Sequence, residues 1–177
     1  KITLLCESEI ADRTLKTFER LKDSGIVYKL DMPKKKTHCK MYIFDEEKVF
    51  LGSTNLSYKS ILHNNETNIL VKNSALAKYY LEYFKQLWNG SDTEPKVGQL
   101  TLQNTEPLVN RRYLPRVLKL LNDARNYIDV YMYGMRLGSP TNPVNKLLDA
   151  LIAANKHGVK VKMMTKKSNY NDILNKY

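Results

Sequence analysis

The chain has 177 residues, of which 42% are hydrophobic and 27% charged, and its formal net charge is +11. This length allows one or at most two domains with a real core, and no run of about 18 apolar residues is present that could cross a bilayer as a helix. The positive charge indicates an anionic partner such as nucleic acid, anionic lipid or a phosphorylated substrate. A well-solvated, lysine-rich surface would explain the charge equally well.

In the first ninety residues, short apolar runs predict strands and apolar residues at helical spacing predict helices. Gly25 is expected to end the first helix, and Ser74 to cap the second. In chain order, the predicted elements are a strand at 2–6, a helix at 11–24, a strand at 26–30, a hairpin within 38–55, a polar turn region at 56–65, a strand at 66–71 and a helix at 74–88.

A cluster of turn-forming residues, NGSDTEPK, interrupts the chain after the second helix and predicts a linker at 91–97. Residues 1–90 and 98–177 are then two separate segments. The predicted elements that follow are short strands at 97–102 and 108–109, a helix at 112–125, a strand at 127–133, a helix from Pro143 to Gly158 capped by Asn142, a strand at 159–164 and a helix starting at 171. Strands alternating with helices predict an α/β fold.

The most informative stretch runs from His38 to Asn55 and reads HCKMYIFDEEKVFLGSTN. In its first part, side chains alternate between two faces with the two-residue period of a strand. The sequence DEEK then predicts a tight turn into a second strand. His38 and Lys40 therefore point to the same face, about 7 Å apart by strand rise. The returning strand brings Ser53 and Asn55 back beside them. One end of a hairpin thus gathers an imidazole, an ammonium, a hydroxyl and an amide, which suit a phosphate group.

The pattern H-x-K-x4-D-x6-G-S-x-N in this stretch resembles the signature of the phospholipase D superfamily, without a gap. Six specified residues at fixed spacing arise by chance roughly once in 10⁷ to 10⁸ starting positions at average residue usage. Glu66, in the sequence NNE, matches the glutamate with which this family holds its catalytic imidazole. The resemblance implies an α/β sandwich, phospholipase D-like, with a mixed β-sheet flanked by helices.

The resemblance also implies a set of roles. His38 would be the nucleophile or the general acid of a phosphodiesterase that works through a phosphohistidine. Lys40, Ser53 and Asn55 would bind the phosphate oxygens, and Glu66 would orient and stabilise the imidazole. Asp45 belongs to the catalytic motif, although its place at the turn favours a structural role. Neither a metal nor another cofactor is required by this chemistry, since cationic side chains supply the positive charge.

A second motif should face the first, because the superfamily works with a pair of histidines. Residues 1–90, which carry the motif, resemble the C-terminal half of a phospholipase D-like repeat, and residues 98–177 resemble the N-terminal half of a second repeat. Lys160 to Met164 repeats the pattern of Lys1 to Leu5. We therefore expect a fragment of a longer tandem protein, numbered from inside it. The second histidine would come from sequence beyond Tyr177 or from a homodimer partner.

For the substrate, the sequence favours nucleic acid. Three lysines at 34–36 precede the motif, and no hydrophobic loop suggests docking to lipid. A phospholipase D or phosphatidyl transferase acting on phospholipid is the first alternative. A catalytically incomplete half, serving as a binding or assembly module, is the second. Two cysteines read as reduced thiols, and the absence of a signal-peptide pattern indicates an intracellular, cytoplasmic protein.

Overall fold

The computed structural model describes residues 2–7, 11–31, 36–90, 94–135 and 138–165, and the chain divides into two compact units, Lys1–Pro107 and Leu108–Tyr177. The division falls later than the predicted linker because the chain after it packs on the first unit. The Gln86 side chain bonds the main chain of Lys96 twice, at 2.7 and 3.2 Å, and Val97 is buried.

The first unit opens with two parallel strands, β1 (Thr3–Cys6) and β2 (Val27–Leu30), joined by helix α1 (Ala11–Leu21). Parallel strands need a crossover of this kind, since a tight turn can join only antiparallel neighbours. Phe18 of α1 is buried, and its ring stacks on Tyr28 of β2 with centroids 4.6 Å apart. The apolar periodicity of α1 is thereby used to cover this pair of strands.

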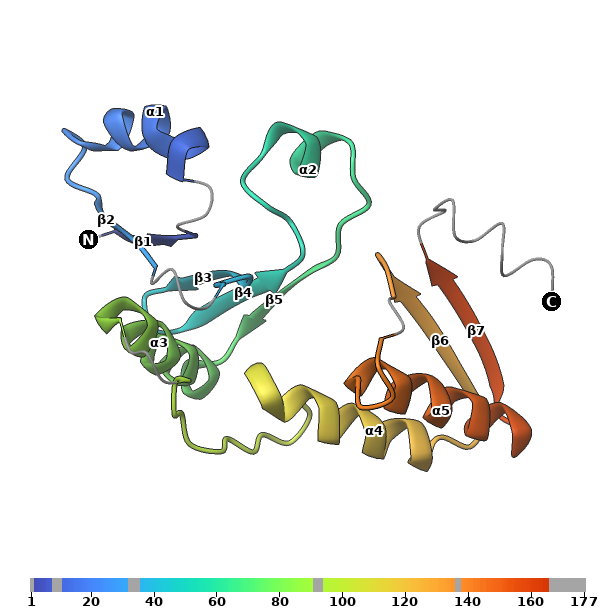
Figure 1. Ribbon diagram of the computed structural model, residues 1–177. Helices are drawn as coiled ribbons and strands as arrows, with labels where there is room; N and C mark the ends of the chain where they lie inside the picture. The colour runs from blue at the N-terminus through green and yellow to red at the C-terminus, as the bar shows by residue number, and fades with distance from the viewer. Residues whose placement is uncertain (1, 8–10, 32–35, 91–93, 136–137, 166–177) are drawn as a thin grey trace. The chain divides into compact units, whose positions relative to one another are not determined.

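Three antiparallel strands follow, β3 (Lys40–Phe44), β4 (Lys48–Gly52) and β5 (Asn68–Lys72), with β4 in the middle. Helix α3 (Ser74–Asn89) covers one face of this sheet (Figure 1). Val49 of β4 and Leu76 and Ala77 of α3 are almost completely buried. The apolar face of β4 therefore packs against the apolar face of α3. Asn73, not the predicted Ser74, caps the helix: its Oδ1 accepts from the Leu76 N–H at 2.9 Å.

Two parts of the chain differ from the predictions. The polar turn region contains a short helix, α2 (Tyr58–Leu62), capped by Ser57. The runs at 97–102 and 108–109 form no strands; an isolated bridge joins Leu102 to Thr105. These runs have strand-forming composition, but no neighbouring strand is there to pair with them, and pairing decides strand formation.

The second unit packs two helices on one parallel pair of strands. It comprises a 3₁₀ turn η2 (Asn110–Arg112), helix α4 (Tyr113–Asp123), strand β6 (Tyr127–Met132), helix α5 (Pro143–Lys156) and strand β7 (Lys160–Thr165). Its core contains Leu121, Ala150 and Leu151. Asn142 caps α5 as predicted, its Oδ1 accepting from the Val144 N–H at 2.9 Å. The helix predicted from 171 lies outside the described residues.

The predicted fold class is confirmed: small sheets, with both parallel and antiparallel pairs, are flanked by helices. The second unit shows this most simply, because α4 and α5 supply the apolar side chains that cover one face of β6 and β7. Among the helices in the described part of the chain, none is long and apolar enough to cross a membrane.

Candidate functional site

The site is built at the end of the three-stranded sheet where β3 begins and β4 ends. Lys40, Gly52 and Asn68 lie opposite one another in the strand register. His38 lies two residues before Lys40, and Ser53 directly follows Gly52. Glu66 lies two residues before Asn68, just ahead of β5. The antiparallel register therefore gathers three segments that are up to 28 residues apart in sequence (66 − 38 = 28).

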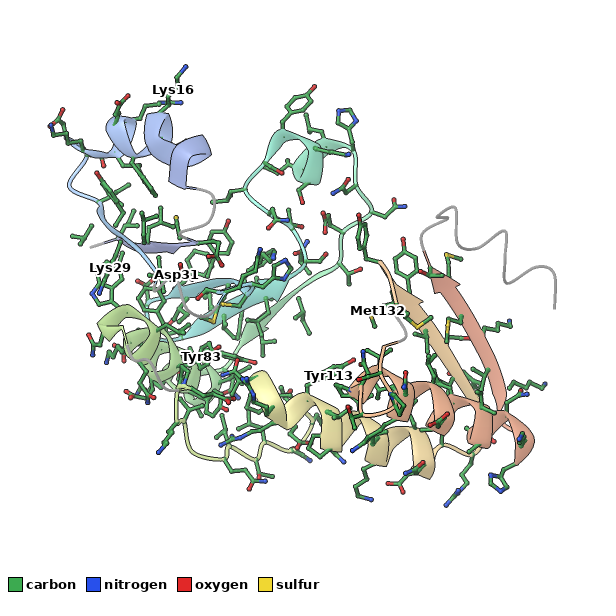
Figure 2. All side chains as sticks on the ribbon, in the orientation of Figure 1. Lys16, Lys29, Asp31, Tyr83, Tyr113 and Met132 are labelled. Atoms are coloured by element: carbon green, nitrogen blue, oxygen red, sulfur yellow. The ribbon has the colours of Figure 1, made fainter. Side chains whose placement is uncertain are left out.

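The main chain leading into His38 is anchored by Asp31, which follows β2 (Figure 2). Asp31 is buried, and its Oδ2 accepts a 3.1 Å hydrogen bond from the Thr37 N–H. The Asp31 N–H in turn donates to the Cys6 carbonyl at 2.8 Å. A carboxylate at the end of β2 thus connects the parallel pair to the start of the motif. Sequence reasoning assigned no role to this residue.

Glu66 is the centre of the hydrogen-bonding network at this end of the sheet. Its Oε2 accepts from the Ser53 hydroxyl at 2.5 Å. Its Oε1 accepts from the Ser60 hydroxyl at 2.5 Å and from the Asn64 side-chain amide at 3.1 Å. These three donors, Ser53 first, lower the pKa of the Glu66 carboxyl below its ordinary value, with a smaller contribution from the charge of Lys40. The network therefore holds Glu66 ionised.

Ser53 is committed to this network by its main chain and its side chain. Its N–H donates to the Thr67 carbonyl at 3.1 Å, and its hydroxyl oxygen accepts from the Thr67 N–H at 3.1 Å. Because the hydroxyl hydrogen is directed at Glu66, it is not presented to a ligand in this arrangement. Within the described residues, the side-chain amide of Asn55 makes no hydrogen bond, which leaves it available as a donor.

His38 and Lys40 lie next to this network. The Lys40 ammonium donates to the His38 carbonyl at 2.8 Å. Desolvation and then the positive charges of Lys40 and Lys36 lower the pKa of the His38 imidazole below its ordinary value. Desolvation likewise lowers the pKa of Lys40. An imidazole kept neutral near neutral pH is a nucleophile or a base rather than an acid.

The predicted contact between His38 and Glu66 takes a different form here. Within the described part of the chain, no hydrogen bond joins the His38 ring to the Glu66 carboxylate, which is instead occupied by hydroxyl and amide donors. Lys40 links the two groups electrostatically, since its charge acts on both. The structure thus brings His38, Lys40, Ser53, Asn55 and Glu66 to one end of the sheet without assembling a bonded His–Glu pair.

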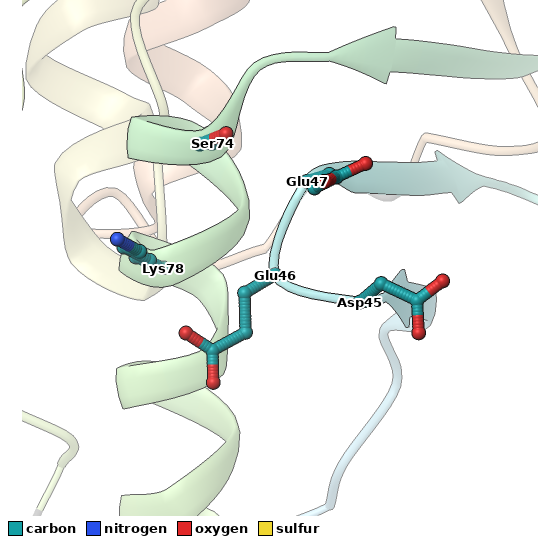
Figure 3. Close-up of a pocket in the computed structure, with 5 residues that line it drawn as sticks. All are labelled: Asp45, Glu46, Glu47, Ser74 and Lys78. Atoms are coloured by element: carbon teal, nitrogen blue, oxygen red, sulfur yellow. The ribbon is translucent and has the colours of Figure 1, made fainter.

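Asp45 lies at the other end of the hairpin. Four strand steps, about 13 Å, separate Lys40 from Phe44. Asp45 and Glu46 both have positive φ, 51° and 55°, and the Glu47 N–H bonds the Phe44 carbonyl at 2.9 Å, as in a type I′ hairpin turn. Together with Ser74 and Lys78 these three acidic residues line a pocket (Figure 3). The position of Asp45 fits a turn residue and not a group that acts on the same phosphate as His38.

The segment between Asn55 and Glu66 differs from the predicted polar turn in a second way. It carries four exposed apolar side chains around α2, at the tip of a loop that extends from the sheet (Figure 1). The exposed fractions are 74% for Leu56, 73% for Tyr58, 58% for Ile61 and 61% for Leu62. The expectation that no hydrophobic loop accompanies the motif is therefore wrong.

Sequence reasoning also missed Ser60, which is 3% exposed and bonds both Glu66 and the Asn55 N–H. A signal was present, because Ser57 and Ser60 have the spacing of a helix cap and its first turn. Among the described residues, no group of three or more His, Cys, Asp and Glu side chains is arranged to hold a metal ion. The positive charge available to an anion at this end of the sheet comes from Lys40, with Lys36 close enough to affect His38.

Comparisons with known proteins agree with this fold. The crystal structure of polyphosphate kinase from Porphyromonas gingivalis is similar, with a TM-score of 0.64 and 17% sequence identity. The match covers 95% of this chain and 29% of the kinase chain, so the chain spans less than a third of that protein, and the likeness shows the fold alone. A search of curated proteins found none that matches. Residues 1–88, just under half of the chain, match the family described as "Cardiolipin synthase, PLD-like domain", and this match supports the phospholipase D superfamily.

Proposed function

We propose that this chain carries one catalytic motif of a phosphodiesterase in which His38 attacks phosphorus. The observation that supports this most directly is the register Lys40–Gly52–Asn68. At this end of the sheet lie an imidazole of lowered pKa, a lysine, an asparagine amide and a glutamate of lowered pKa, in the segment that matches a phospholipase D-like domain. These groups supply a nucleophile and the charge that a phosphoryl transition state needs.

In the proposed reaction, the neutral His38 imidazole forms a bond to phosphorus as the bond to the leaving alcohol breaks. A second imidazole, from another motif, donates the proton that the alcohol takes. The same group then removes a proton from water or an acceptor alcohol, whose oxygen displaces His38 and regenerates it. Lys40 and the Asn55 amide stabilise the phosphate oxygens throughout. Ser53 contributes through Glu66, to which its hydroxyl is bonded.

For the substrate we favour nucleic acid. The net charge of +11 provides the sequence-independent attraction to a polyanion, and Lys36 lies close enough to His38 to alter its pKa. Binding of this kind weakens steeply with salt because counterions are released from the phosphates. The proposal places the protein among nucleases, acting without a metal, inside the cell.

A phospholipid substrate is the second candidate, and one observation favours it. The four exposed apolar residues around α2, Leu56, Tyr58, Ile61 and Leu62, follow Asn55 directly and precede Glu66. Apolar side chains beside a phosphate site can enter the acyl region of a membrane while the site meets the headgroup. Transfer to an acceptor alcohol would then replace hydrolysis.

The test is cleavage of bis-p-nitrophenyl phosphate in EDTA by the wild type and by His38→Ala. Turnover that the substitution removes would support a histidine mechanism. His157→Ala is the matched control, because that imidazole is exposed at the end of α5 in the second unit and should leave the rate unchanged. A folded wild type without turnover would favour the incomplete half, which needs a second motif from a longer chain or a second copy.

Substrate choice is tested in parallel with single-stranded DNA and with vesicles of anionic phospholipid. A nuclease should degrade the DNA, and its rate should fall as salt rises. Leu56→Ser combined with Ile61→Ser should not affect DNA cleavage. If instead the vesicle lipid is cleaved or transferred, and the double variant loses that activity, the nucleic acid proposal is wrong.

A further inference from the structure

Ser60 lies beside the site and is almost fully enclosed, with 3% of its surface exposed. Buried hydroxyls need hydrogen-bond partners, and Ser60 has one on each side. Its oxygen accepts from the Asn55 N–H at 2.9 Å, and its hydrogen is donated to Glu66 Oε1 at 2.5 Å. One hydroxyl therefore joins Asn55, three residues after the end of β4, to Glu66, two residues before β5.

The direction of these bonds is fixed by the main chain. An N–H can only donate, so the Asn55 N–H uses Ser60 Oγ as its acceptor. The Ser60 hydroxyl hydrogen is then donated to the Glu66 carboxylate. The Thr67 amide does the same for Ser53 on the other oxygen of Glu66. Two backbone amides thus set two hydroxyl donors, one for each carboxylate oxygen. An ionised carboxylate accepts from both hydroxyls and from Asn64 more strongly than a protonated one, which has less acceptor capacity.

We propose that Ser60 is a positioning residue, which holds the Glu66 carboxylate ionised and fixes the main chain of Asn55 at the phosphate-binding end of the sheet. It acts through these two residues and touches no substrate. This inference rests on the proposed function for its effect on turnover, whereas its effect on Glu66 and Asn55 can be measured without any activity.

The helix α2 offers a way to separate this role from ordinary folding. Ser57 caps α2, its side-chain oxygen accepting from the Ser60 N–H at 3.3 Å. The Ser57 N–H also donates to the Asn55 carbonyl at 2.8 Å, a main-chain bond that a side-chain substitution keeps. Ser57→Ala therefore weakens the helix start while keeping the Ser60 hydroxyl. Ser60→Ala removes the hydroxyl. Ser60→Cys fills nearly the same space with a thiol, which is a weak donor and a weak acceptor.

The experiment is an NMR titration of the Glu66 side-chain carboxyl carbon, together with hydrogen exchange of the Asn55 amide, in the three variants. In Ser60→Ala we expect the pKa of Glu66 to rise, because a donor to its ionised form is lost. The Asn55 amide should also exchange faster. Ser60→Cys should lie between Ser60→Ala and the wild type, and Ser57→Ala should match the wild type in the Glu66 titration.

For turnover of bis-p-nitrophenyl phosphate, Ser60→Ala should lower kcat on the order of tenfold with little change in KM, as when the partner that orients a functional side chain is removed. If Ser60→Ala and Ser60→Cys both titrate and exchange as the wild type does, the proposal is overturned. Should Ser60→Ala not fold, Ser60→Cys alone decides. A wild type without turnover would count against the proposed function, while the titration and exchange would still judge Ser60.

Discussion

The two ends of the β3–β4 hairpin carry residues of one sequence motif, yet their surroundings differ. At the end with Lys40 and Gly52, side chains from three segments converge on the carboxylate of Glu66. At the other end, Asp45 and Glu46 form the turn. Within the described residues, the Asp45 side chain takes part in no hydrogen bond or ion pair. One end, the network end, carries the hydrogen-bonding network of Glu66, and the other, the turn end, consists of the hairpin turn.

The difference explains why the spacing of the motif is fixed. Asp45 is seven residues after His38 and seven before Gly52 (45 − 38 = 7; 52 − 45 = 7). With the turn at 45–47, the register pairs Phe44 with Lys48 and returns Gly52 opposite Lys40. A shift of one residue would turn every side chain of a strand to the other face and separate Ser53 from its partners. In this arrangement Asp45 sets where the strand returns, and the proposed chemistry belongs to the network end.

The largest effect is expected at the network end, from Gly52→Ala. A Cβ at Gly52 would clash with the Asn68 side chain and lie 2.7 Å from the Thr67 carbonyl, which is main chain and cannot move aside alone. Thr67 also holds Ser53, so the clash reaches the carboxylate network. We expect a loss of about 1–3 kcal/mol in the free energy of unfolding, the usual cost of overpacking, measured in urea.

Gly98→Ala is the matched control for this change. A Cβ there meets nothing within 4 Å, so its unfolding free energy should stay within about 0.5 kcal/mol of the wild type. Equal stability of Gly52→Ala and Gly98→Ala would show that the row Lys40–Gly52–Asn68 is not as tightly packed as described. The network end would then lose its main distinction from the turn end.

Much of this comparison could be predicted from the sequence, because local patterns determine it. The alternation around the motif predicted β3 and β4, and the DEEK turn placed Asp45 at the hairpin tip. The cap of α5 at Asn142 was also predicted, since a cap depends on residues a few positions away. Patterns that act over two to four residues were reliable guides here.

What the sequence did not reveal depends on contacts that reach beyond the next four residues. Asp31 anchors Thr37 and Ser60 bonds Glu66 only because the fold brings them together. The runs at 97–102 and 108–109 failed as strands for the same reason, since a strand needs a partner that composition cannot supply. The apolar residues around α2 fall within one turn region that was predicted from the sequence, but the structure shows that their side chains are exposed.

A smaller effect is expected from Lys36→Gln, which tests the electrostatics of the network end. Its positive charge is one of the causes that lower the pKa of His38, after desolvation and Lys40. Removing it should raise the pKa of His38, which can be followed by NMR of the imidazole. Lys78→Gln, at the turn end, should leave that pKa unchanged.

The sign of the accompanying stability change follows from linkage. A histidine whose pKa is lowered on folding stabilises the folded state above its ordinary pKa of about 6.5, and that stability is lost as pH falls through the folded value. Lys36→Gln should therefore lose less stability than the wild type on acidification through this range. A pKa of His38 that is unchanged or lower in Lys36→Gln would contradict the electrostatic account.

The smallest effect is expected from Asp45→Asn at the turn end. Asparagine adopts positive φ as readily as aspartate and suits a type I′ turn, so the hairpin and its register should persist. We expect the unfolding free energy to change by less than about 0.5 kcal/mol and turnover of bis-p-nitrophenyl phosphate to stay within about twofold. Asp45→Val, which disfavours positive φ, should destabilise the hairpin and lower turnover with it. If Asp45→Asn lost turnover while remaining as stable as the wild type, the carboxylate itself would be needed for the chemistry, and the two ends of the hairpin would act together instead of dividing the motif into a turn and a site.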